Sequence, residues 1–572
     1  MEKRWQLLTP DPDLVRLLCG ELGCHPVVAT LLANRGMRTP DQAQSFLNPS
    51  LSHLRPPNGL ADLEPAVQRI VRAITAREPI LVFGDYDVDG TTATAVLLEF
   101  LTACGAQVSC YIPHRLNEGY GLQARHVGEV MVPRGVRLVI TADCGTGSHA
   151  AVRAAAQAGI DIVVTDHHTV SGELPPAVAV VNPKRPDCPA GLGHLAGVGV
   201  VFCLALALRK RLRDVGFWQD RPEPNLKSAC DLVALGTIAD MVPLVEENRI
   251  LSRTGLELIR RGRRPGLSAL LEAAGIPDRP TESEDVAFRL GPRLNAAGRI
   301  GHALTAVELL TAGGDDEARR IAQSLNALNS HRQEIERGIL ADIQDTLGRH
   351  PELLHERTLV MAHPGWHQGV IGIVASKVME LHYRPVVLIS LKDGAGRGSA
   401  RSIPGIDLYA CLHACRELLE DLGGHLQAAG LRITEERLPA FRRAFEAAVG
   451  TRSTAEDFRP RLRIDAALEL EDITPGLIDQ IEGLMPYGSG NPEPLFVARD
   501  LVVASSSWVA QHHRRMVLRP AAGPADRSFR AIQFNADPRT GAQNRFERLA
   551  FKLRWNRWNG SQTPQLVVEA VA

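Results

Sequence analysis

The sequence predicts an α/β protein with a parallel sheet, followed by a second α/β unit and a small β-barrel. Two runs rich in β-branched residues, Val136–Thr141 and Ile160–Thr165, are separated by a helical pattern at about Ser148–Ala158. Strand, helix, strand is the order that builds a parallel sheet. An apolar run at Leu81–Gly84 is also followed directly by a helix-like run, Thr91–Leu101. Beyond residue 455 the pattern changes to short β-like runs separated by turns, which is typical of an antiparallel barrel.

The three predicted strands of the first unit all end in acidic or imidazole side chains. These are Asp85, Asp87 and Asp89 after the first strand, Asp143 after the second, and Asp166, His167 and His168 after the third. A further aspartate, Asp240, ends an apolar helix-like segment. Because the carboxyl ends of parallel strands meet at one edge of a sheet, we expect these groups to lie together. Crowded carboxylates repel one another unless cations neutralise them, and oxygen ligands with imidazole favour Mg²⁺ or Mn²⁺.

Each of these signals has an ordinary structural explanation when taken alone. A strand-end aspartate often caps the following helix, and paired histidines often lie in a loop whose hydrogen bonds are satisfied. Taken together, six carboxylates and two imidazoles in one domain favour a metal site.

The same segments carry a family resemblance. The segments GDYDVDG, ADCG, TDHH and GTIAD resemble the four motifs of the DHH phosphoesterases. Later segments, GPRLNAAGRIGHA, GWHQGVIGIVASKV, GRGSARS and GGHLQAAG, resemble the RecJ branch of that family, the single-strand-specific 5′→3′ exonucleases. The resemblance runs from about residue 45 to the C-terminus. It implies a DHH catalytic domain, a DHHA1 domain and an OB-fold.

The resemblance also implies roles for the strand-end residues. Two divalent ions, Mn²⁺ or Mg²⁺, are expected, and they would clamp the attacking and leaving oxygens of a phosphodiester. Asp143 is the expected bridge between them, and Asp85 is either a ligand or a residue behind the ligands. His168 is expected to contact the scissile phosphate or the leaving oxygen. The implied ligands are Asp85, Asp87, Asp89, Asp143, His167 and Asp240, and the catalytic set is Asp87, Asp89, Asp143, His167, His168 and Asp240.

A second group of residues is suited to holding phosphate. The segment Gly396–Ser402 offers two arginines, two serines and backbone N–H groups, and the planar fork of arginine matches phosphate oxygens. The structural alternative is a glycine-rich turn with surface arginines, or arginines in ion pairs between domains. The candidate phosphate-binding residues are Arg115, Arg293, Arg299, Arg397, Ser399, Arg401 and His425.

Charge is unevenly distributed along the chain. The whole sequence is close to neutral, at −1, but the stretch 511–560 holds eleven Arg or Lys against three Asp or Glu. The same stretch contains six Phe or Trp residues, most of which we expect in the barrel core. Trp555 and Trp558 are the candidates for stacking on bases, because aromatic rings beside basic residues bind single strands without reading sequence.

The length and composition bound the remaining possibilities. A chain of 572 residues is too long for one core, and 45% hydrophobic with 23% charged residues is ordinary for a globular protein. We expect five segments: a helical lead-in (1–44), the DHH domain (45–313), a connecting helix (314–350), the DHHA1 domain (351–450) and the OB-fold (455–572). The ten cysteines are scattered, and neither a signal peptide nor a membrane span is evident, so a cytoplasmic protein is expected.

These observations predict an exonuclease that degrades single-stranded DNA from its 5′ end to mononucleotides, in DNA repair and recombination. By resemblance, single-strand-binding protein and a DNA helicase would supply the substrate. One alternative is a DHH phosphodiesterase acting on short oligonucleotides or cyclic dinucleotides, although a dinucleotide needs no extended binding platform. Another is a non-catalytic single-strand-binding scaffold, although such a scaffold has no reason to keep a costly cluster of carboxylates.

Overall fold

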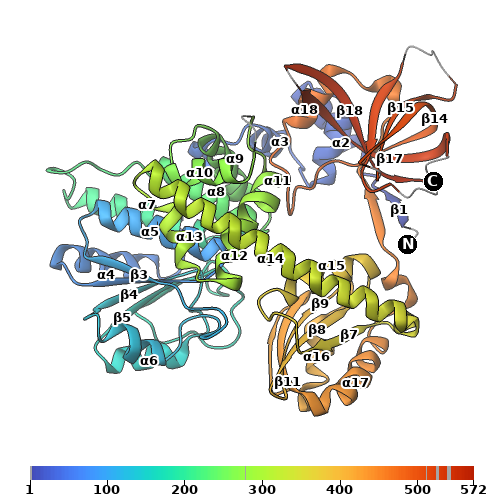
Figure 1. The fold of residues 1–572 in the computed structure, drawn as a ribbon. Coiled ribbons are helices and arrows are strands. Elements are labelled where there is room, and N and C mark those ends of the chain that lie inside the picture. The colour runs from blue at the N-terminus through green and yellow to red at the C-terminus, as the bar shows by residue number, and fades with distance from the viewer. Residues whose placement is uncertain (1–2, 277–278, 511, 523–526, 537–542, 559) are drawn as a thin grey trace.

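The computed structural model describes residues 3–276, 279–510, 512–522, 527–536, 543–558 and 560–572. Three bodies are visible, with the long helix α14 (Asp315–Arg349) running from the first to the second and the barrel lying above the second in this view (Figure 1). Among the described residues, no helix combines the length and the apolar character needed to cross a membrane.

The first body is built on a parallel five-stranded sheet in the order β3-β2-β4-β5-β6. Its strands are β2 (Ile80–Gly84), β3 (Val108–Tyr111), β4 (Leu138–Ala142), β5 (Asp161–Thr165) and β6 (Ala179–Val181). Alternate residues of β2 enter opposite cores: Val82 packs with the helices of one face, and Phe83 packs on the other. The parallel sheet and the three strands predicted before the acidic motifs are confirmed.

Helices cover both faces of this sheet. One face packs against α4 (Leu63–Ala76), α5 (Val88–Ala103), α7 (Gly197–Asp214) and α8 (Cys230–Ala239), and the other against α6 (His149–Gln157). The remaining helices of this body are α9 (Glu246–Arg260), α10 (Pro265–Ala273), α11 (Ser283–Asp285), α12 (Gly291–Ile300) and α13 (Leu304–Leu310).

Helix α14 belongs to two cores. Ile321 and Leu325, near its N-terminus, pack into the core of the first body, whereas Ile339 and Ile343 pack into the second. A helix buried at both ends in different cores fixes the spacing of the two bodies, so the predicted connecting role is confirmed.

The second body is a mixed sheet in the order β10-β11-β9-β8-β7. Its strands are β7 (Leu359–His363), β8 (Val386–Lys392), β9 (Ala395–Arg401), β10 (Asp421–Gly424) and β11 (Ala428–Thr434), and its helices are α15 (Ile371–His382), α16 (Leu408–His413) and α17 (Leu438–Gly450).

The segment expected to be a flexible phosphate cradle is strand β9, paired on both sides. That expectation about the backbone was wrong, because the backbone N–H groups of a paired strand are largely engaged with its neighbours. The glycines serve close packing: a Cβ at Gly396 would lie 2.8 Å from Ile389, and one at Gly398 would lie 2.7 Å from Leu431. The side chains of Ser399 and Arg401 remain available for an anion.

The third body is a closed barrel. Strand β14 (Phe496–Val509) pairs with both β15 (His513–Pro520) and β17 (Arg545–Trp558), and β16 (Phe529–Gln533) and β18 (Ser561–Val571) complete the circuit. A short strand, β13 (Ala466–Ala467), and helix α18 (Pro475–Glu482) flank it. The predicted barrel is confirmed.

The N-terminal segment packs against this C-terminal barrel. Strand β1 (Arg4–Leu7) pairs in parallel with β12 (Arg461–Ile464), ahead of helices α1 (Pro12–Leu22), α2 (Pro26–Asn34) and α3 (Pro40–Leu47). Leu31 and Phe46 share one core with Phe496 of the barrel. The lead-in is therefore mostly helical, as expected, but its partner lies more than 400 residues away.

Candidate metal and phosphate site

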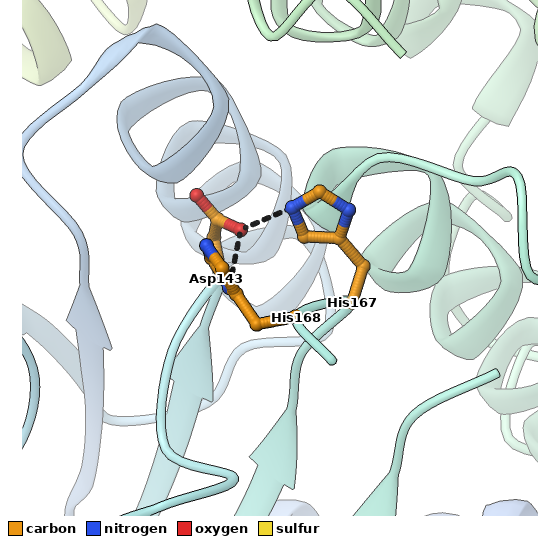
Figure 2. Close-up of side chains that lie close together, drawn as sticks. All are labelled: Asp143, His167 and His168. Atoms are coloured by element: carbon orange, nitrogen blue, oxygen red, sulfur yellow. Dashed lines mark ion pairs between the residues drawn. The ribbon is translucent and has the colours of Figure 1, made fainter. Parts of the chain in front are cut away.

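The strand-end residues of the first body converge at one edge of its sheet. Strands β2, β4 and β5 are neighbours, so the residues that follow them meet. Asp143 after β4 faces His167 and His168 after β5 (Figure 2). Asp240 joins from the C-terminus of α8. The expected gathering of carboxylates and imidazoles is what the structure contains.

His167 lies at the centre of a first candidate metal-binding group, which it forms with Asp89 and Asp240. Its Nε2 atom is 3.2 Å from Asp143 Oδ1, 3.6 Å from Asp240 Oδ2 and 3.7 Å from Asp89 Oδ2. Its Nδ1 atom is 3.1 Å from the Leu195 carbonyl oxygen, so Nδ1 carries the proton and donates it there. Burial, followed by the neighbouring His168, lowers the pKa of His167 to about 3. The ring is thus neutral, with the lone pair of Nε2 aimed at three carboxylates, as a metal ligand requires.

Asp143, which contacts His167 of the first group, belongs to a second candidate group. Ligand atoms of Asp85, Asp87 and Asp143 lie within 4.8 Å of one another, as do those of Asp89, His167 and Asp240 in the first group. A carboxylate adjoining both groups is placed to bridge two ions. Gly197 permits this closeness, because a Cβ there would lie 2.5 Å from Asp143 Oδ1.

The polar atoms of the site fit divalent cations. Asp85 Oδ1, Asp143 Oδ1 and His167 Nε2 are buried without a hydrogen-bond partner in the described structure. Burial, followed by neighbouring carboxylates, raises the pKa of Asp85 and of Asp143 well above the ordinary value. The same causes raise the pKa of Asp89 to about 7 and that of Asp240 to about 9. Cations would satisfy these atoms and relieve the repulsion.

Backbone donors hold the two aspartates at the start of α5, Asp87 as its N-cap and Asp89 in its first turn. Both oxygens of Asp89 accept N–H groups at the start of α7, from Gly197 at 2.6 Å and from Val198 at 2.8 Å. Asp87 caps α5 by accepting the Gly90 N–H at 3.0 Å. These bonds orient the carboxylates before any ion binds.

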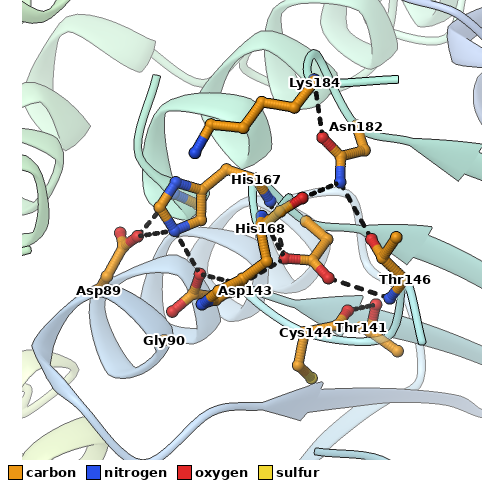
Figure 3. Close-up of polar contacts among 12 residues, drawn as sticks. Asp89, Gly90, Thr141, Asp143, Cys144, Thr146, His167, His168, Asn182 and Lys184 are labelled. Carbon is orange, nitrogen blue, oxygen red and sulfur yellow. Dashed lines mark hydrogen bonds and ion pairs between the residues drawn. The ribbon is translucent and has the colours of Figure 1, made fainter. Parts of the chain in front are cut away.

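Asp166 holds the two histidines in place, a role that the sequence analysis did not assign to it. Its Oδ1 accepts the His168 Nδ1–H at 2.7 Å and the backbone N–H of His167 at 2.7 Å. Its Oδ2 accepts the Thr146 N–H at 2.9 Å. Figure 3 shows the two histidines with the neighbouring Thr146 and Asn182. Burial alone would raise the pKa of Asp166, but the bonds from His168 and from the backbone lower it below its ordinary value. The sequence signal for this role was the position of Asp166 as the first residue of the Asp-His-His motif.

The same contact sets the charge of His168. Burial by itself lowers the pKa of this ring, but the hydrogen bond and charge of Asp166 outweigh that effect and raise the pKa to about 9. Asn182, after β6, supports the segment by donating its Nδ2–H groups to the His168 carbonyl and to Thr146 Oγ1. His168 is therefore an imidazolium at neutral pH, a donor where His167 is an acceptor.

A further acidic group nearby is occupied by an arginine. His194, Glu246 and Glu247 lie close enough to hold an ion. However, Arg55 donates to the carboxylates of both glutamates. Burial by itself raises the pKa of Glu247, but the bonds from Arg55 and His194 outweigh it and lower that pKa. A guanidinium already supplies the positive charge, so this group is an ion-pair network.

Three of the predicted phosphate-binding arginines gather between the first two bodies. Arg115 lies over the Tyr86 ring, with its guanidinium carbon 4.8 Å from the ring centroid. Burial, then the positive charges of Arg115, Arg332 and Arg401, lower the pKa of Arg299 to about 9. Burial and Arg115 likewise lower the pKa of Arg401. We call Arg115, Arg299 and Arg401 the arginine trio; within the described residues none of the three pairs with a carboxylate.

Ser399 and Arg401 lie side by side on β9. Arg401 Nη1 donates to Ser399 Oγ at 3.1 Å, and Arg401 Nε donates to Ser376 Oγ at 3.1 Å. Both side chains approach the start of α15, where a Cβ at Gly372 would lie 3.0 Å from Ser399 Oγ. The arrangement presents donors without an acidic acceptor, which suits an anion.

The other phosphate candidates are placed differently. Arg293 donates to Asn326 Oδ1 at 2.9 Å and to the Arg289 carbonyl, so its donors are engaged where α12 meets α14. Arg397 is exposed on β9 and donates to the Leu116 carbonyl at 3.3 Å, across the gap between the bodies. His425 is exposed in the turn between β10 and β11.

The structure shows which aromatic rings of the barrel are buried and which are exposed, a distinction that the sequence did not reveal. Phe546 and Phe551 are core residues, as expected for most of the set. Trp555 lies within β17, partly buried against the barrel core, and its Nε1–H donates to Asp479 at 2.8 Å. The side chain of Trp558 is outside the described residues. Trp508 and Phe534, which are 42% and 52% exposed, are the large rings of the described barrel that face solvent.

The basic surplus of this region is partly neutralised by acids from elsewhere in the chain. Arg554 pairs with Glu493 and Glu284, and Arg557 pairs with Glu482. A count along the sequence therefore overstates the positive charge of the barrel surface.

Comparison with known proteins agrees with this geometry. A family model described as the DHH family, N-terminal domain, matches residues 79–237; the DHHA1 domain matches residues 355–451, and the RecJ OB domain matches residues 464–570. The single-stranded-DNA-specific exonuclease RecJ of Escherichia coli is 36% identical over 585 residues, covering 100% of this chain and 100% of the relative. The chain belongs to the RecJ family.

Other RecJ proteins support the assignment. The RecJ of Bacillus subtilis is 35% identical, covering 100% of this chain and 71% of its own length. A crystal structure of RecJ from Thermus thermophilus in complex with Mn²⁺ superposes with a TM-score of 0.81 at 31% identity, covering 100% of this chain and 79% of that one. RecJ from the same organism has also been crystallised with Mg²⁺.

Proposed function

We propose that this chain is an exonuclease that hydrolyses single-stranded DNA from its 5′ end and releases 5′-mononucleotides. The observation that carries the proposal is the pair of candidate metal-binding groups that Asp143 adjoins, near an anion site built from the arginine trio. Membership of the RecJ family supports single-stranded DNA as the substrate. A role in DNA repair and recombination follows from the same membership, and a cytoplasmic location suits such a substrate.

Two Mn²⁺ or Mg²⁺ ions are proposed as the cofactors. The residues that would hold them are His167, Asp89 and Asp240 on one side and Asp85 and Asp87 on the other, with Asp143 between. When bound, such ions neutralise charge on the scissile phosphate and supply hydroxide at neutral pH. The protein contributes the orientation, because Leu195, Gly197 and Val198 fix His167 and Asp89 through backbone hydrogen bonds.

His168 is proposed to act on the scissile phosphate. Asp166 accepts one of its ring N–H groups and keeps the ring protonated, which leaves the other ring N–H as a charged donor. A charged donor stabilises the negative charge that develops on the phosphate or on the leaving oxygen. Asp166 thus acts through His168, not on the substrate.

The 5′ polarity is proposed to come from the anion site. A terminal phosphate carries more negative charge than an internal one, and Arg115, Arg299 and Arg401 offer positive charge without acidic competition. Ser399 adds a hydroxyl beside Arg401. Arg397 and His425 are proposed to make weaker contacts at the rim, and Arg293 is proposed to have at most a supporting part.

The division of labour is proposed to follow five segments: 1–44, 45–313, 314–350, 351–450 and 455–572. The DHH and DHHA1 segments would contribute the metal and anion sites on opposite sides of the scissile nucleotide. The barrel would bind the following strand. The sequence favours Trp555 and Trp558 for stacking on bases, whereas the exposure of Trp508 favours that ring over Trp555. Single-strand-binding protein and a DNA helicase are proposed to present the unpaired strand.

Cleavage and binding measured separately test this function. Asp143→Ala should abolish hydrolysis of a 5′-phosphorylated single strand in saturating Mn²⁺, because the residue adjoins both groups of ligands. Binding of the same strand should largely survive, since the barrel proposed to bind it is a separate body from the one that holds Asp143. Near-normal turnover by Asp143→Ala would contradict the two-metal site. Wild-type cleavage of a dinucleotide but not of long strands would favour the smaller-substrate phosphodiesterase, and binding without cleavage would favour the scaffold.

A further inference from the structure

Asn248 lies behind the metal site, at the start of α9, and its side chain is fully buried. Its two Nδ2–H groups donate to two backbone carbonyls that are far apart in the sequence, His194 at 2.6 Å and Pro243 at 3.0 Å. Because both acceptors are carbonyl oxygens, the orientation of the amide is unambiguous. One side chain therefore joins two loops.

The first loop orients two metal-binding groups. His194 is followed by Leu195, whose carbonyl oxygen accepts the Nδ1–H of His167. Two residues further on, α7 begins, and its first N–H groups hold both oxygens of Asp89. A shift of this loop would rotate the imidazole and release the carboxylate together.

The second loop carries another group of the same metal-binding set. Pro243 lies three residues after Asp240, in the turn that leads from α8 to α9. The Leu244 N–H in this turn donates to the Ser489 carbonyl at 2.7 Å, so the turn is held from both sides. Asn248 thereby fixes the distance between the Asp240 side and the His167–Asp89 side.

We propose that Asn248 is a positioning residue for metal binding, which sets the spacing of His167, Asp89 and Asp240 by tying their two supporting loops together. The inference rests on the proposed metal-ligand assignment. Residues behind metal ligands typically change metal affinity by about 10–100-fold when they are removed. Asn248 should therefore affect the affinity for Mn²⁺ more than the folding of the domain.

The substitution Asn248→Leu tests this, because leucine keeps the branched shape but has no donors. Mn²⁺ binding to metal-stripped protein is measured by calorimetry, alongside the shift of the melting temperature with Mn²⁺ concentration. We expect the affinity to fall by about 10–100-fold. Asn248→Ser retains one hydroxyl donor, so its Mn²⁺ affinity should lie between those of wild type and Asn248→Leu. The serine variant provides the test if the leucine variant does not fold. Cleavage by either variant should recover as Mn²⁺ is raised.

Two reference variants make each outcome decisive. Ile259→Ala opens a cavity on the same helix, at a side chain that is 1% exposed and is not part of either loop. It should lower the melting temperature while leaving Mn²⁺ affinity unchanged, and an equal loss of affinity there would reduce Asn248 to a general stabiliser. Asp143→Ala checks the site itself. If Asp143→Ala loses Mn²⁺ binding while the Mn²⁺ affinity of Asn248→Leu stays within about twofold of wild type, the role of Asn248 is wrong but the ligand assignment stands. If Asp143→Ala also binds Mn²⁺ normally, the ligand assignment fails.

Discussion

The guanidinium of Arg249 stacks on the ring of Phe46, with its central carbon 3.8 Å from the ring centroid. Arg249 belongs to α9 of the first body and Phe46 to the N-terminal lead-in. The same guanidinium donates to the Phe46 carbonyl at 2.8 Å and, at 2.9 Å, to each of the carbonyls of Leu484 and Met485 beside the barrel. Burial, followed by the nearby Arg253, lowers the pKa of Arg249 to about 9. One buried cation thus joins three parts of the chain through backbone carbonyls.

Replacing Arg249 by Met should therefore loosen the barrel. The carbonyls of Phe46 and Met485 lose this donor, whereas the Leu484 carbonyl keeps the bond from Asn491 Nδ2. Each buried group left unsatisfied costs about 1–3 kcal/mol. We expect the melting temperature to fall. We also expect the substitution to raise the KM for long strands more than it raises the KM for trinucleotides. Arg253→Met is the matched control, because Arg253 makes one bond to the same lead-in, to the Leu47 carbonyl. Equal effects of the two substitutions on long-strand KM would contradict the coupling role.

The carboxylate cluster predicts how metal-free stability depends on pH. The folded-state pKa values of Asp89 (about 7) and Asp240 (about 9) are raised, so the folded state keeps protons that the unfolded state releases above about pH 4. The stability from these groups is fully present below that pH and is lost as pH rises through the folded values. His168, with its pKa raised to about 9, adds to the loss in the same direction.

The metal-stripped protein should accordingly melt at lower temperature as pH rises from about 6 to about 9, and saturating Mn²⁺ should remove most of the decline. Asp240→Asn deletes one titrating group, so its profile should be flatter and its unfolding free energy at about pH 9 higher by on the order of 1–3 kcal/mol. Thermal unfolding in chelator across this range measures both. A variant profile parallel to that of wild type would show that Asp240 does not titrate as inferred.

Recognition of the 5′ end should depend on the anion site. The double substitution Ser399→Ala with Arg401→Ala should shrink the rate advantage of a 5′-phosphate over a 5′-hydroxyl end, since a charge-assisted bond contributes about 1.5–3 kcal/mol. Mn²⁺ affinity should stay unchanged. Arg293→Ala is the comparison, because its donors already serve Asn326 and the Arg289 carbonyl. If the double variant keeps the wild-type ratio of rates, another group must read the end.

The exposed rings of the barrel predict where bases stack. Trp508→Ala should weaken binding of a long single strand by at least about fivefold, because stacking contributes about 1–3 kcal/mol per base. Trp555→Ala should mainly lower stability, since this ring packs on the barrel core and bonds to Asp479. Fluorescence anisotropy at fixed salt and thermal melting separate the two effects. A larger loss of binding in the Trp555 variant would instead make Trp555 the stacking residue.

Local patterns were enough to locate the chemistry. Asp85, Asp143 and His167 each follow a short β-branched or apolar run, and parallel strands bring their carboxyl ends to one edge, so their convergence could be predicted. The long helical pattern with separate apolar stretches likewise indicated α14. The strand and helix patterns also indicated the second α/β unit and, beyond residue 455, the barrel, and the family motifs identified them as a DHHA1 domain and an OB-fold.

What the sequence by itself determined is the class of fold, the set of side chains that gather as candidate metal ligands, and the reaction such a set suits. Only the tertiary structure decided which residues support them. The pairing of β1 with β12, the donors of Asn248, the cation of Arg249 and the exposure of Trp508 over Trp555 all depend on contacts between distant segments. A buried amide or arginine reads like any other in a sequence, because its role is set by the carbonyls that meet it in space.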